Sequence, residues 1–185
     1  MTVRISKPAF NLRDKLTELD FARVPYEKMP PQSIIQRKRY FNTGTKASTS
    51  SSDLDIITGQ IRPIFSSSQI LIELAVTPYG GNADTLSVRG RIRRGYGVGT
   101  ASSGTQIMYN RRMFFRSGSA LKAMCGQMVA MDEPHTTDIL EYVFQANVES
   151  TSGASTIEFY SDGYGVAAPE NVMTIMEIRG NSWLL

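Results

Sequence analysis

The clearest pattern in the sequence is an apolar run at residues 70–76, in which Glu73 is the only polar residue. The run is rich in β-branched side chains, which favours a strand that is buried on most of its surface. Upstream, residues 58–65 form a second, alternating segment, and three serines at positions 66–68 separate the two segments. Two strands joined by a short serine turn predict a β-hairpin. Pro63 cannot donate a hydrogen bond to a neighbouring strand, so we expect the first strand at a sheet edge.

Alternating or apolar segments predict further strands along most of the chain. They cover residues 33–41, 86–93, 107–115, 125–131, 139–148, 156–160 and 172–178. Turn residues separate these segments at intervals of about 8–12 residues, which is typical of all-β domains. The crossover helices that a parallel sheet needs are missing from the pattern. We therefore predict a mainly β chain that forms an antiparallel β-sandwich or jelly roll.

The pattern changes in the first 46 residues. Asn11 is a suitable N-cap, and leucines at positions 12, 16 and 19 recur at helical spacing, so we predict a short helix at about residues 12–22. Three prolines within residues 25–31 then predict an extended linker, which leads into the strand at 33–41. We accordingly divide the chain into an N-terminal arm, residues 1–46, and a β-sandwich body, residues 47–185.

Charge separates the same two parts. The net charge is +3 overall, but residues 1–46 hold ten Lys and Arg against four Asp and Glu, while residues 47–185 hold ten against thirteen. A basic arm on a mildly acidic body indicates an acidic partner. Arms of this composition gain order when they lie on a partner, which couples their folding to assembly.

Composition excludes several classes of protein. The single cysteine, Cys125, excludes an intramolecular disulfide framework and a cysteine-based zinc site. The sequence opens without a charged and apolar leader, and no apolar run approaches ~18 residues. We therefore expect neither secretion by a signal peptide nor a membrane span, and we expect synthesis in a host cytoplasm.

The candidates for catalysis are weak. His135 is the only histidine; it lies in a predicted turn, and the chain has no Gly-x-Ser-x-Gly nucleophile motif. Gly95, Gly97 and Gly99 suggest a phosphate loop, but the third glycine would have to stand at position 100, which is threonine. We predict that the protein is not an enzyme and binds no cofactor or metal.

An arginine-rich strand is the most basic part of the body. Arg89, Arg91 and Arg93 project from one side of the predicted strand. A single-stranded nucleic-acid site would interleave more aromatic residues with them, so we expect no direct nucleic-acid contact. We expect these arginines to pair with acidic residues of neighbouring strands, and contact with a second subunit is the alternative. The carboxylates of Asp53 and Asp55 are expected to be solvated.

Several motifs together resemble a family of bacteriophage virion proteins. The matching residues are Thr58-Gly59, then Pro63 and the stretch Ser66 to Ile72, the turn from Asp132 to Thr136-Thr137, and the ending Met173 to Gly180. Members of this family carry jelly-roll heads in tail-fibre tips and in capsid-decorating proteins of cyanobacterial and other marine phages. The resemblance spans roughly residues 54–180. It implies a trimeric β-sandwich without catalysis, and residues 1–46 do not match the repetitive shaft of a fibre.

We therefore expect a structural protein of the virion, most specifically a cement or decoration protein of a phage head. It would form a homotrimer and attach through its arm to the major capsid protein. The alternative is a tail-fibre or tail-adaptor component with a host-binding jelly-roll tip. A nucleic-acid-binding protein and an enzyme rank behind these two.

This hypothesis assigns residues to two interfaces. The interface with the capsid protein combines basic residues with apolar anchors: Arg13, Leu16, Leu19, Phe21, Arg23, Tyr26, Arg37, Lys38 and Arg39. The trimer interface takes apolar residues in excess of what one thin sandwich needs: Ile34, Ile72, Leu74, Val143 and Phe144.

Overall fold

The structure is a computed structural model, and it describes most of the predicted body. The described residues are 26, 29–42, 44–49, 51–80, 85–117, 122–123, 126–152, 157–159 and 171–180. The helix predicted at residues 12–22 lies outside them. In the part of the chain that is described, no helix is long and apolar enough to cross a membrane.

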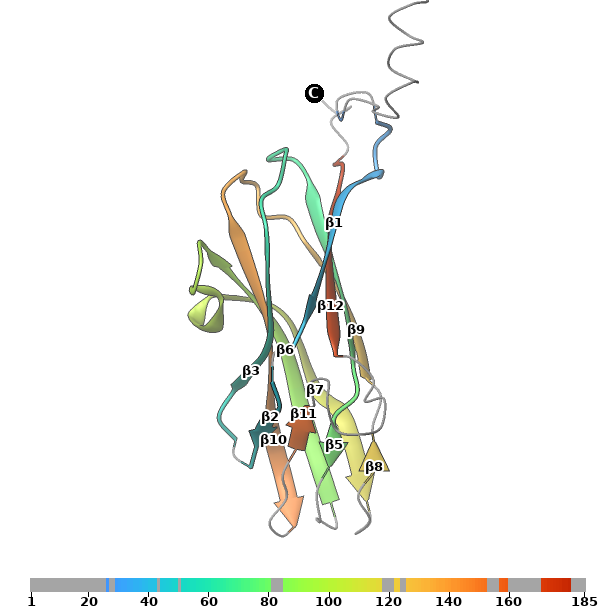
Figure 1. Cartoon of the computed structure of the whole chain (residues 1–185), viewed down its shortest axis with the longest axis vertical. Helices are drawn as coiled ribbons and strands as arrows, with labels where there is room; N and C mark the ends of the chain where they lie inside the picture. Colours follow the sequence, from blue (N-terminus) through green and yellow to red (C-terminus); the bar gives the residue numbers. More distant parts are fainter. Residues whose placement is uncertain are drawn as a thin grey trace, which may run out of the picture.

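Two four-stranded antiparallel sheets face each other (Figure 1). Sheet 1 has the order β1 (Ile34–Phe41), β12 (Val172–Ile178), β4 (Gln69–Val76) and β9 (Gly126–Asp132). Sheet 2 has the order β3 (Leu54–Ile61), β10 (Leu140–Ser152), β6 (Thr85–Tyr96) and β7 (Thr105–Ser117).

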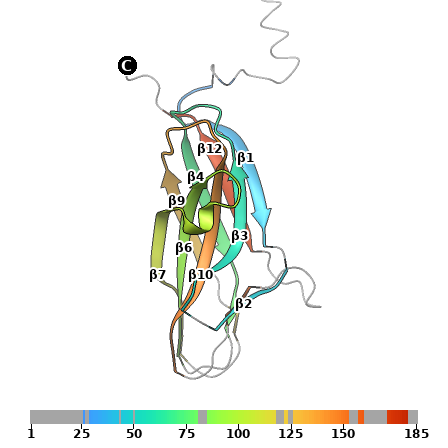
Figure 2. The same ribbon diagram turned by 90° about the vertical axis from the view of Figure 1, so that its left-hand side faces the viewer.

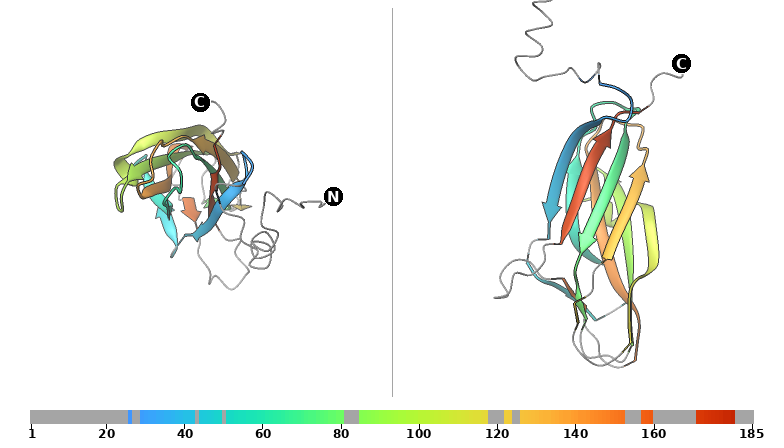
Figure 3. Two further views of the ribbon diagram at one scale, coloured as in Figure 1. Left: turned by 90° about the horizontal axis from the view of Figure 1, so that it is seen from above. Right: turned by 90° about the vertical axis from the view of Figure 1, so that its right-hand side faces the viewer.

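The order of these strands is that of a jelly roll. The chain passes from β1 in sheet 1 to β3 in sheet 2, back to β4, and over again to β6, so most connections cross between the sheets. Strand β1 also lies beside β3, and β7 beside β9, which closes the sandwich along both sides (Figure 3, left). The predicted fold class, a mainly β antiparallel sandwich or jelly roll, is confirmed.

A small third sheet extends one end of the sandwich. Its order is β2 (Lys46–Ser48), β11 (Ile157–Phe159), β5 (Tyr79–Gly80) and β8 (Lys122–Ala123). These strands lie in the connections that join sheet 1 to sheet 2, at the lower end in Figure 1. At the other end of β6, a 3₁₀ turn, η2 (Ala101–Ser103), belongs to the connection with β7. The other long strands and β11 were predicted from the sequence, but the strand predicted at residues 58–65 is β3 at Leu54–Ile61, and β2, β5 and β8 were missed.

The predicted hairpin of residues 58–77 is wrong. Strand β3 pairs with β10 in sheet 2, whereas β4 pairs with β12 and β9 in sheet 1. The serine segment is therefore a crossing between sheets. The carboxylate of Glu177 on β12 fixes it by accepting hydrogen bonds from the N–H groups of Ile64 (2.7 Å) and Phe65 (3.2 Å) and from the Ser68 hydroxyl (2.7 Å).

The boundary between arm and body also differs from the predicted one. Strand β1, which we assigned to the arm, pairs with β12 from Ile34 to Phe41 and is part of sheet 1. It contributes to the core as well, because the Tyr40 ring lies directly over Gly59 of β3. A Cβ atom at Gly59 would lie 2.4 Å from Tyr40 Cδ2, so a side chain at this position would displace the ring. The sandwich thus begins at β1, and residues 1–33 precede it.

Alternation along the strands fills the space between the sheets with apolar side chains. The largest fully buried ones are Tyr142, Phe144, Phe159, Ile57, Ile61, Ile70, Ile72, Ile92, Met128, Leu140 and Ile157. Residues of β12 and β4 that point the other way form the outer face of sheet 1, which is treated next.

Candidate functional site

The outer face of sheet 1 is the most unusual surface of the sandwich. Because successive side chains of a strand point to opposite sides, the pairing of the four strands aligns the outward side chains in rows. The three rows are Phe41–Val172–Ala75–Gln127, Arg39–Thr174–Glu73–Val129 and Arg37–Met176–Leu71–Met131. Figure 3 (right) looks onto this face. We call these twelve residues, with the neighbouring pair Ile34 and Ile178, the outer face.

The outer face is largely apolar although it meets solvent. Val129 is 59% exposed, Ile34 54%, Met131 49% and Phe41 44%. An antiparallel sheet with one wet side normally carries polar residues there. These exposed side chains lie on the two edge strands, β1 and β9, whereas Thr174 and Met176 on β12 between them are buried. Exposed apolar surface on a soluble protein marks a site of interaction. The outer face is therefore the candidate functional surface.

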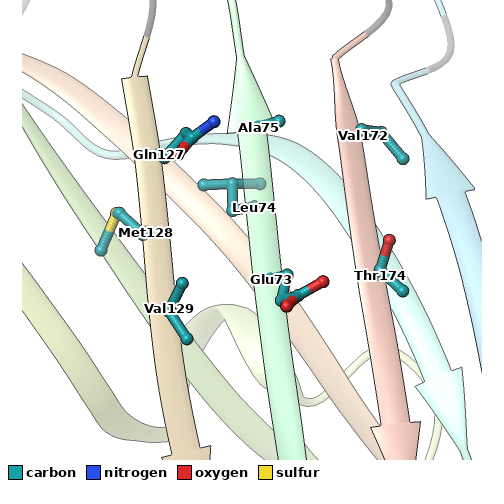
Figure 4. Close-up of a pocket in the computed structure, with 8 residues that line it drawn as sticks. All are labelled: Glu73, Leu74, Ala75, Gln127, Met128, Val129, Val172 and Thr174. Atoms are coloured by element: carbon teal, nitrogen blue, oxygen red, sulfur yellow. The ribbon is translucent and has the colours of Figure 1, made fainter.

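A shallow groove of about 260 Å³ runs across it. The groove lies over β9, β4 and β12, and Figure 4 shows Val129, Glu73 and Thr174 along one stretch of it. Gln127, Ala75 and Val172 line the adjoining stretch. An open groove of this composition suits apolar side chains of a protein partner, with Glu73 as a single charge.

Basic residues lie along the β1 margin of the outer face. Arg37, Lys38 and Arg39 are all exposed. The Arg37 and Arg39 positions are in the outward rows, and the Arg39 guanidinium lies 5.5 Å from the centroid of the Phe41 ring. The cationic and apolar side chains of this face together favour a partner that presents acidic and apolar groups side by side.

The outside of sheet 2 differs from this face where its side chains are described. Its outward residues Glu141, Gln145 and Asn147 on β10 are buried, because the connection from β6 to β7 lies in front of them (Figure 2). Gln145 donates to Asp55 (2.6 Å), and Asn147 donates to Asp53 (2.7 Å). The chain itself thus covers these residues and pairs their amide N–H groups, although Gln145 Oε1 and Asn147 Oδ1 are buried without a hydrogen-bond partner.

Glu141 holds the covering connection in place. Its carboxylate accepts hydrogen bonds from the N–H groups of Gly99 (2.9 Å) and Ala101 (3.2 Å) and from the Gln60 amide (3.0 Å). Burial alone would raise the pKa of Glu141, but these hydrogen bonds outweigh it and lower the pKa below its ordinary value. Gly97 and Gly99 have positive φ angles of 89° and 77°, which few other residues adopt. The glycines therefore serve a fixed connection, and no phosphate-loop geometry follows them.

A buried ionic cluster joins the two sheets. The Arg94 guanidinium on β6 donates to both carboxylate oxygens of Asp132 at the end of β9, at 2.7 and 2.8 Å. The Tyr142 hydroxyl on β10 donates to the same carboxylate at 2.6 Å. Burial, the first cause, and the hydrogen bond with Asp132 together raise the pKa of Tyr142 far above its ordinary value. The three side chains bind one another, which supports a structural role, although the Nε atom of Arg94 is buried without a hydrogen-bond partner.

The prediction that the arginines of this strand pair with acidic residues is confirmed for Arg91 among the three arginines named, and the acidic partner is not on a neighbouring strand. Arg91 forms an ion pair with Asp53 (3.0 Å), and Arg94 pairs with Asp132. Arg93 donates to the Gly104 carbonyl (3.0 Å). Asp53 is exposed, as expected for a solvated carboxylate, although it also pairs with Arg91 and Asn147. Asp55 is only half-exposed and accepts hydrogen bonds from Gln145 and Ser102.

The predicted catalytic candidates gain no support from the geometry. His135 is exposed and lies in the connection before β10, with a positive φ of 53°. Among the described residues, no three His, Cys, Asp or Glu side chains are grouped in a way that could hold a metal ion.

Only some of the residues predicted for the interface with a capsid protein are among those that the structure describes. Arg37, Lys38 and Arg39 are exposed on β1. Arg37 and Arg39 lie in the rows of the outer face, whereas Lys38 pairs with the core residue Ile175 and lies on the other side of the strand. Tyr26 is 41% exposed, and its carbonyl accepts a hydrogen bond from Arg179 (3.1 Å). The remaining members, Arg13, Leu16, Leu19, Phe21 and Arg23, lie outside the described residues.

Four of the five residues predicted for a trimer interface are wrong. Ile72, Leu74, Val143 and Phe144 are 0–2% exposed within the single chain. Ile72, Leu74 and Phe144 belong to the core. Val143 lies on the other side of β10, between Thr58 and Arg93, and is buried there. Only Ile34 is accessible, at the edge of the outer face. The error arose because the core of a two-sheet sandwich takes more apolar side chains than we allowed.

The outer face itself was not predicted from the sequence. Val129 and Met131 lie on β9, whose alternation was recognised, with Met128 and Ala130 pointing into the core. The sequence did contain a signal: inward and outward positions of β9 are both apolar, and the same is largely true of β12. A strand that is apolar on both sides and lies in a two-sheet sandwich exposes one apolar side.

Comparisons with known proteins add little. No protein-family model matches the chain, and no curated protein matches it. Similar solved structures include the particle of infectious bursal disease virus known as T13 (14% identity, TM-score 0.41, 85% of this chain and 40% of that one) and a VP2 subviral particle of the same virus (12%, 0.39, 85% and 42%). The chain spans about two fifths of the length of these chains. At such TM-scores the likeness carries no argument, and the assignment of the fold rests on the strand order.

Proposed function

We propose that this protein is a structural component of a virus particle. Most specifically, it is a cement protein that attaches to the major capsid protein of a phage head and stabilises the shell. The basic arm and the margin of β1 make the attachment, and the jelly roll projects from the shell. The proposed role is structural rather than enzymatic.

The observation that supports the proposal best is the open, apolar outer face with its cationic margin. The chain already covers the outside of sheet 2 with its own β6–β7 connection, whereas Val129, Met131 and Phe41 on sheet 1 remain exposed. The family resemblance of residues 54–180 and the basic arm support the same proposal. A partner that supplies acidic and apolar groups fits both the arm and the margin.

Magnitudes indicate which contacts hold the protein on a shell. Exposed ion pairs, such as those Arg37 and Arg39 can form, contribute about 0–1 kcal/mol each and are weakened by salt. Desolvated leucines and aromatic residues can contribute about 2 kcal/mol or more. The apolar residues of the arm, Leu16, Leu19, Phe21 and Tyr26, are therefore the main anchors in this proposal. The arginines steer association and set the orientation.

The test is a reconstitution with particles that are produced without this chain. Purified protein is mixed with such particles, and the fraction that sediments with them is measured against salt concentration. We expect Phe21→Ala with Tyr26→Ala to abolish retention at all salt concentrations. Removal of the charges at Arg37, Lys38 and Arg39 should lower retention chiefly at low salt, where their attraction is least screened, and should make retention less dependent on salt.

A matched control is Val98→Ala, which changes a 69% exposed residue outside the outer face and should leave retention unchanged. Full retention of the Phe21→Ala, Tyr26→Ala variant would show that the arm is not the attachment device. In that case a tail-fibre or tail-adaptor component, with its loops on a host surface, becomes the better hypothesis. A wild-type chain that sediments with no particle would contradict the structural role altogether.

A further inference from the structure

The two main sheets end in four edge strands, β1 and β9 in sheet 1 and β3 and β7 in sheet 2. An edge strand presents backbone N–H and C=O groups to which a further strand can bind. Soluble proteins prevent such pairing with charged side chains, prolines and β-bulges at the edge. The four edges of this sandwich differ in these features.

Three of the edges are irregular or charged. The pairing of β1 with β12 is shifted after Ile34, and residues 37–39 in the middle of β1 are Arg-Lys-Arg, all exposed. The pairing of β3 with β10 is shifted between Phe144 and Gln145, and Pro63 follows β3. The pairing of β7 with β6 is shifted at two places. These features disfavour the addition of a further strand at β1, β3 and β7.

The edge at β9 is different. Its seven residues pair with β4 without a shift in register, and residues 126–131 contain neither a charged residue nor a proline. The terminal Asp132 is buried and bound by Arg94. Val129 is 59% and Met131 49% exposed, and β9 runs along the margin of sheet 1 (Figure 3, right). The neighbouring β7 belongs to sheet 2, so β9 is the last strand of its own sheet.

The sequence of β9 is complementary to itself. In an antiparallel pair of two β9 strands centred on Val129, this residue would lie opposite Val129 of the second copy. Met128 would lie opposite Ala130, so that a large inward side chain meets a small one, and Gln127 would lie opposite Met131. Apolar cross-strand pairs of this kind stabilise a sheet.

The opposite edge of sheet 1 lacks this complementarity. A pair of β1 strands centred on Lys38 would place Lys38 opposite Lys38 and Arg37 opposite Arg39. Like charges that lie directly opposite each other are destabilising. Because β9 matches its own sequence and β1 does not, a second copy of the chain is the partner that fits the β9 edge.

We propose that two copies of this chain pair through β9, antiparallel and centred on Val129, so that the two copies of sheet 1 form one continuous sheet. A two-fold axis relates the copies, and each β9 edge covers the other, so assembly through this edge stops at a dimer. The two outer faces then adjoin, and the Arg37 and Arg39 positions of β1 lie at the two far margins. The pairing leaves β1 accessible, and it does not depend on the proposed attachment to a shell.

This dimer differs from the homotrimer that we expected from the sequence. Of the five residues predicted for the trimer interface, only Ile34 is accessible, and it lies on β1. The β9 edge contains none of the five, so the two assemblies use different strands and can be distinguished by mass and by mutation.

Sedimentation velocity of the purified full-length protein tests the assembly. We expect the wild type to have twice the mass of the chain, with dissociation only on strong dilution. Val129→Lys places two lysines opposite each other, and we expect it to raise the dissociation constant of the dimer by about tenfold or more. Val98→Lys makes the same change at a 69% exposed residue of the β6–β7 connection and should leave the dimer unchanged. Far-UV circular dichroism should be the same for all variants and so reports an intact fold.

A second control separates pairing of edges from stacking of the two outer faces. Phe41→Lys changes an exposed residue of the outer face on the opposite edge strand, β1, and should also leave the dimer unchanged. Equal losses in Val129→Lys and Phe41→Lys would overturn the proposal, because they would indicate stacked faces. A wild-type monomer, or a trimer, at high concentration would overturn it as well.

Cysteine substitution tests the register. In a Cys125→Ser background, Val129→Cys places the two cysteines directly opposite, where paired Cα atoms lie about 4.5–5.5 Å apart and a disulfide can form. Met131→Cys is the matched control on the same edge, because the two copies of residue 131 would lie about 14 Å apart along the strands. On mild oxidation we expect disulfide-linked dimers of Val129→Cys to appear several-fold faster than those of Met131→Cys. Equal rates, or no linked dimer of Val129→Cys, contradict the proposal.

Discussion

Two buried glutamates each fix a connection of this sandwich. Glu141 on β10 holds the β6–β7 connection through the N–H groups of Gly99 and Ala101, and Glu177 on β12 holds the β3–β4 connection through those of Ile64 and Phe65. In both cases a carboxylate accepts hydrogen bonds from backbone N–H groups of a connection, where no neighbouring strand is there to pair them. Such groups are costly to leave unpaired when they are buried.

The first prediction concerns Glu141. Replacement by glutamine removes one acceptor and turns an amide N–H₂ toward existing donors, so we expect a loss of about 1–3 kcal/mol in the free energy of unfolding. Urea denaturation at neutral pH measures it. Glu73→Gln is the matched control, since Glu73 is exposed on the outer face, and it should change stability by less than about 0.5 kcal/mol. An equal effect of both substitutions would contradict the role of Glu141.

The pKa of Glu141 adds a pH dependence with a defined sign. Its pKa is lowered in the folded protein relative to its ordinary value of 4.5, so the folded state favours the ionised form. The resulting stabilisation is complete above about pH 4.5 and is lost as the pH falls through the lower, folded-state pKa. The stability of the wild type should therefore fall more steeply below pH 4.5 than that of Glu141→Gln. Parallel curves would show that Glu141 is not responsible.

The cluster of Arg94, Asp132 and Tyr142 gives another prediction at this scale. Asp132→Ala leaves a buried guanidinium without its partner, and we expect a loss of about 3–5 kcal/mol. Tyr142→Phe removes one hydrogen bond to a charged group and should cost less, about 1.5–3 kcal/mol. Thermal and urea denaturation of the two variants give the comparison. A larger loss for Tyr142→Phe than for Asp132→Ala would contradict the prediction that the ion pair of Arg94 and Asp132 is the main stabilising contact of the cluster.

At the scale of elements, β4 shows how one strand serves two surfaces. Ile70, Ile72 and Leu74 point into the core, while Leu71, Glu73 and Ala75 lie in the rows of the outer face. Ile72→Ala should thus cost about 2–5 kcal/mol in the free energy of unfolding. Val129→Ala on the neighbouring strand removes part of a 59% exposed side chain and should cost much less. Similar losses for both would contradict the division into a core side and an outer side.

The sequence predicted elements better than their connections. Strands such as 139–148 and 172–178 were recognised because apolar alternation and turn residues are local signals. Whether Ser66–Ser68 turns a strand back within one sheet or carries it to the other sheet depends on Glu177, more than 100 residues away. No local pattern contains that information. The assignment of residues 33–41 to the arm failed for the same reason, since the partner of β1 is the last strand.

The candidate site was predictable only in part. The basic margin at Arg37–Arg39 was found from charge alone, and the structure leaves these residues exposed. The apolar centre of the outer face was missed because apolar residues were assigned to the core or to a trimer contact without knowledge of sheet order. Once β9, β4 and β12 are known to be neighbours, Val129, Leu71 and Met176 fall on one surface.

The whole molecule is asymmetric between its two faces. The chain covers the outside of sheet 2 with its own connection and fills it with hydrogen-bonded polar groups, while the outer face of sheet 1 stays apolar with a cationic margin. The proposed role in a virus particle follows from this asymmetry and from the basic arm, which enters at the margin of the same face.

The most direct test of the central claim is the number of copies of this chain in purified particles. Quantitative mass spectrometry, with labelled peptides of this chain and of the major capsid protein as standards, measures the ratio of the two proteins. A cement protein of the head predicts hundreds of copies per particle, retained through a wash at low salt. Tens of copies or fewer would indicate a tail component, and the absence of the chain from particles would contradict a structural role in the virion.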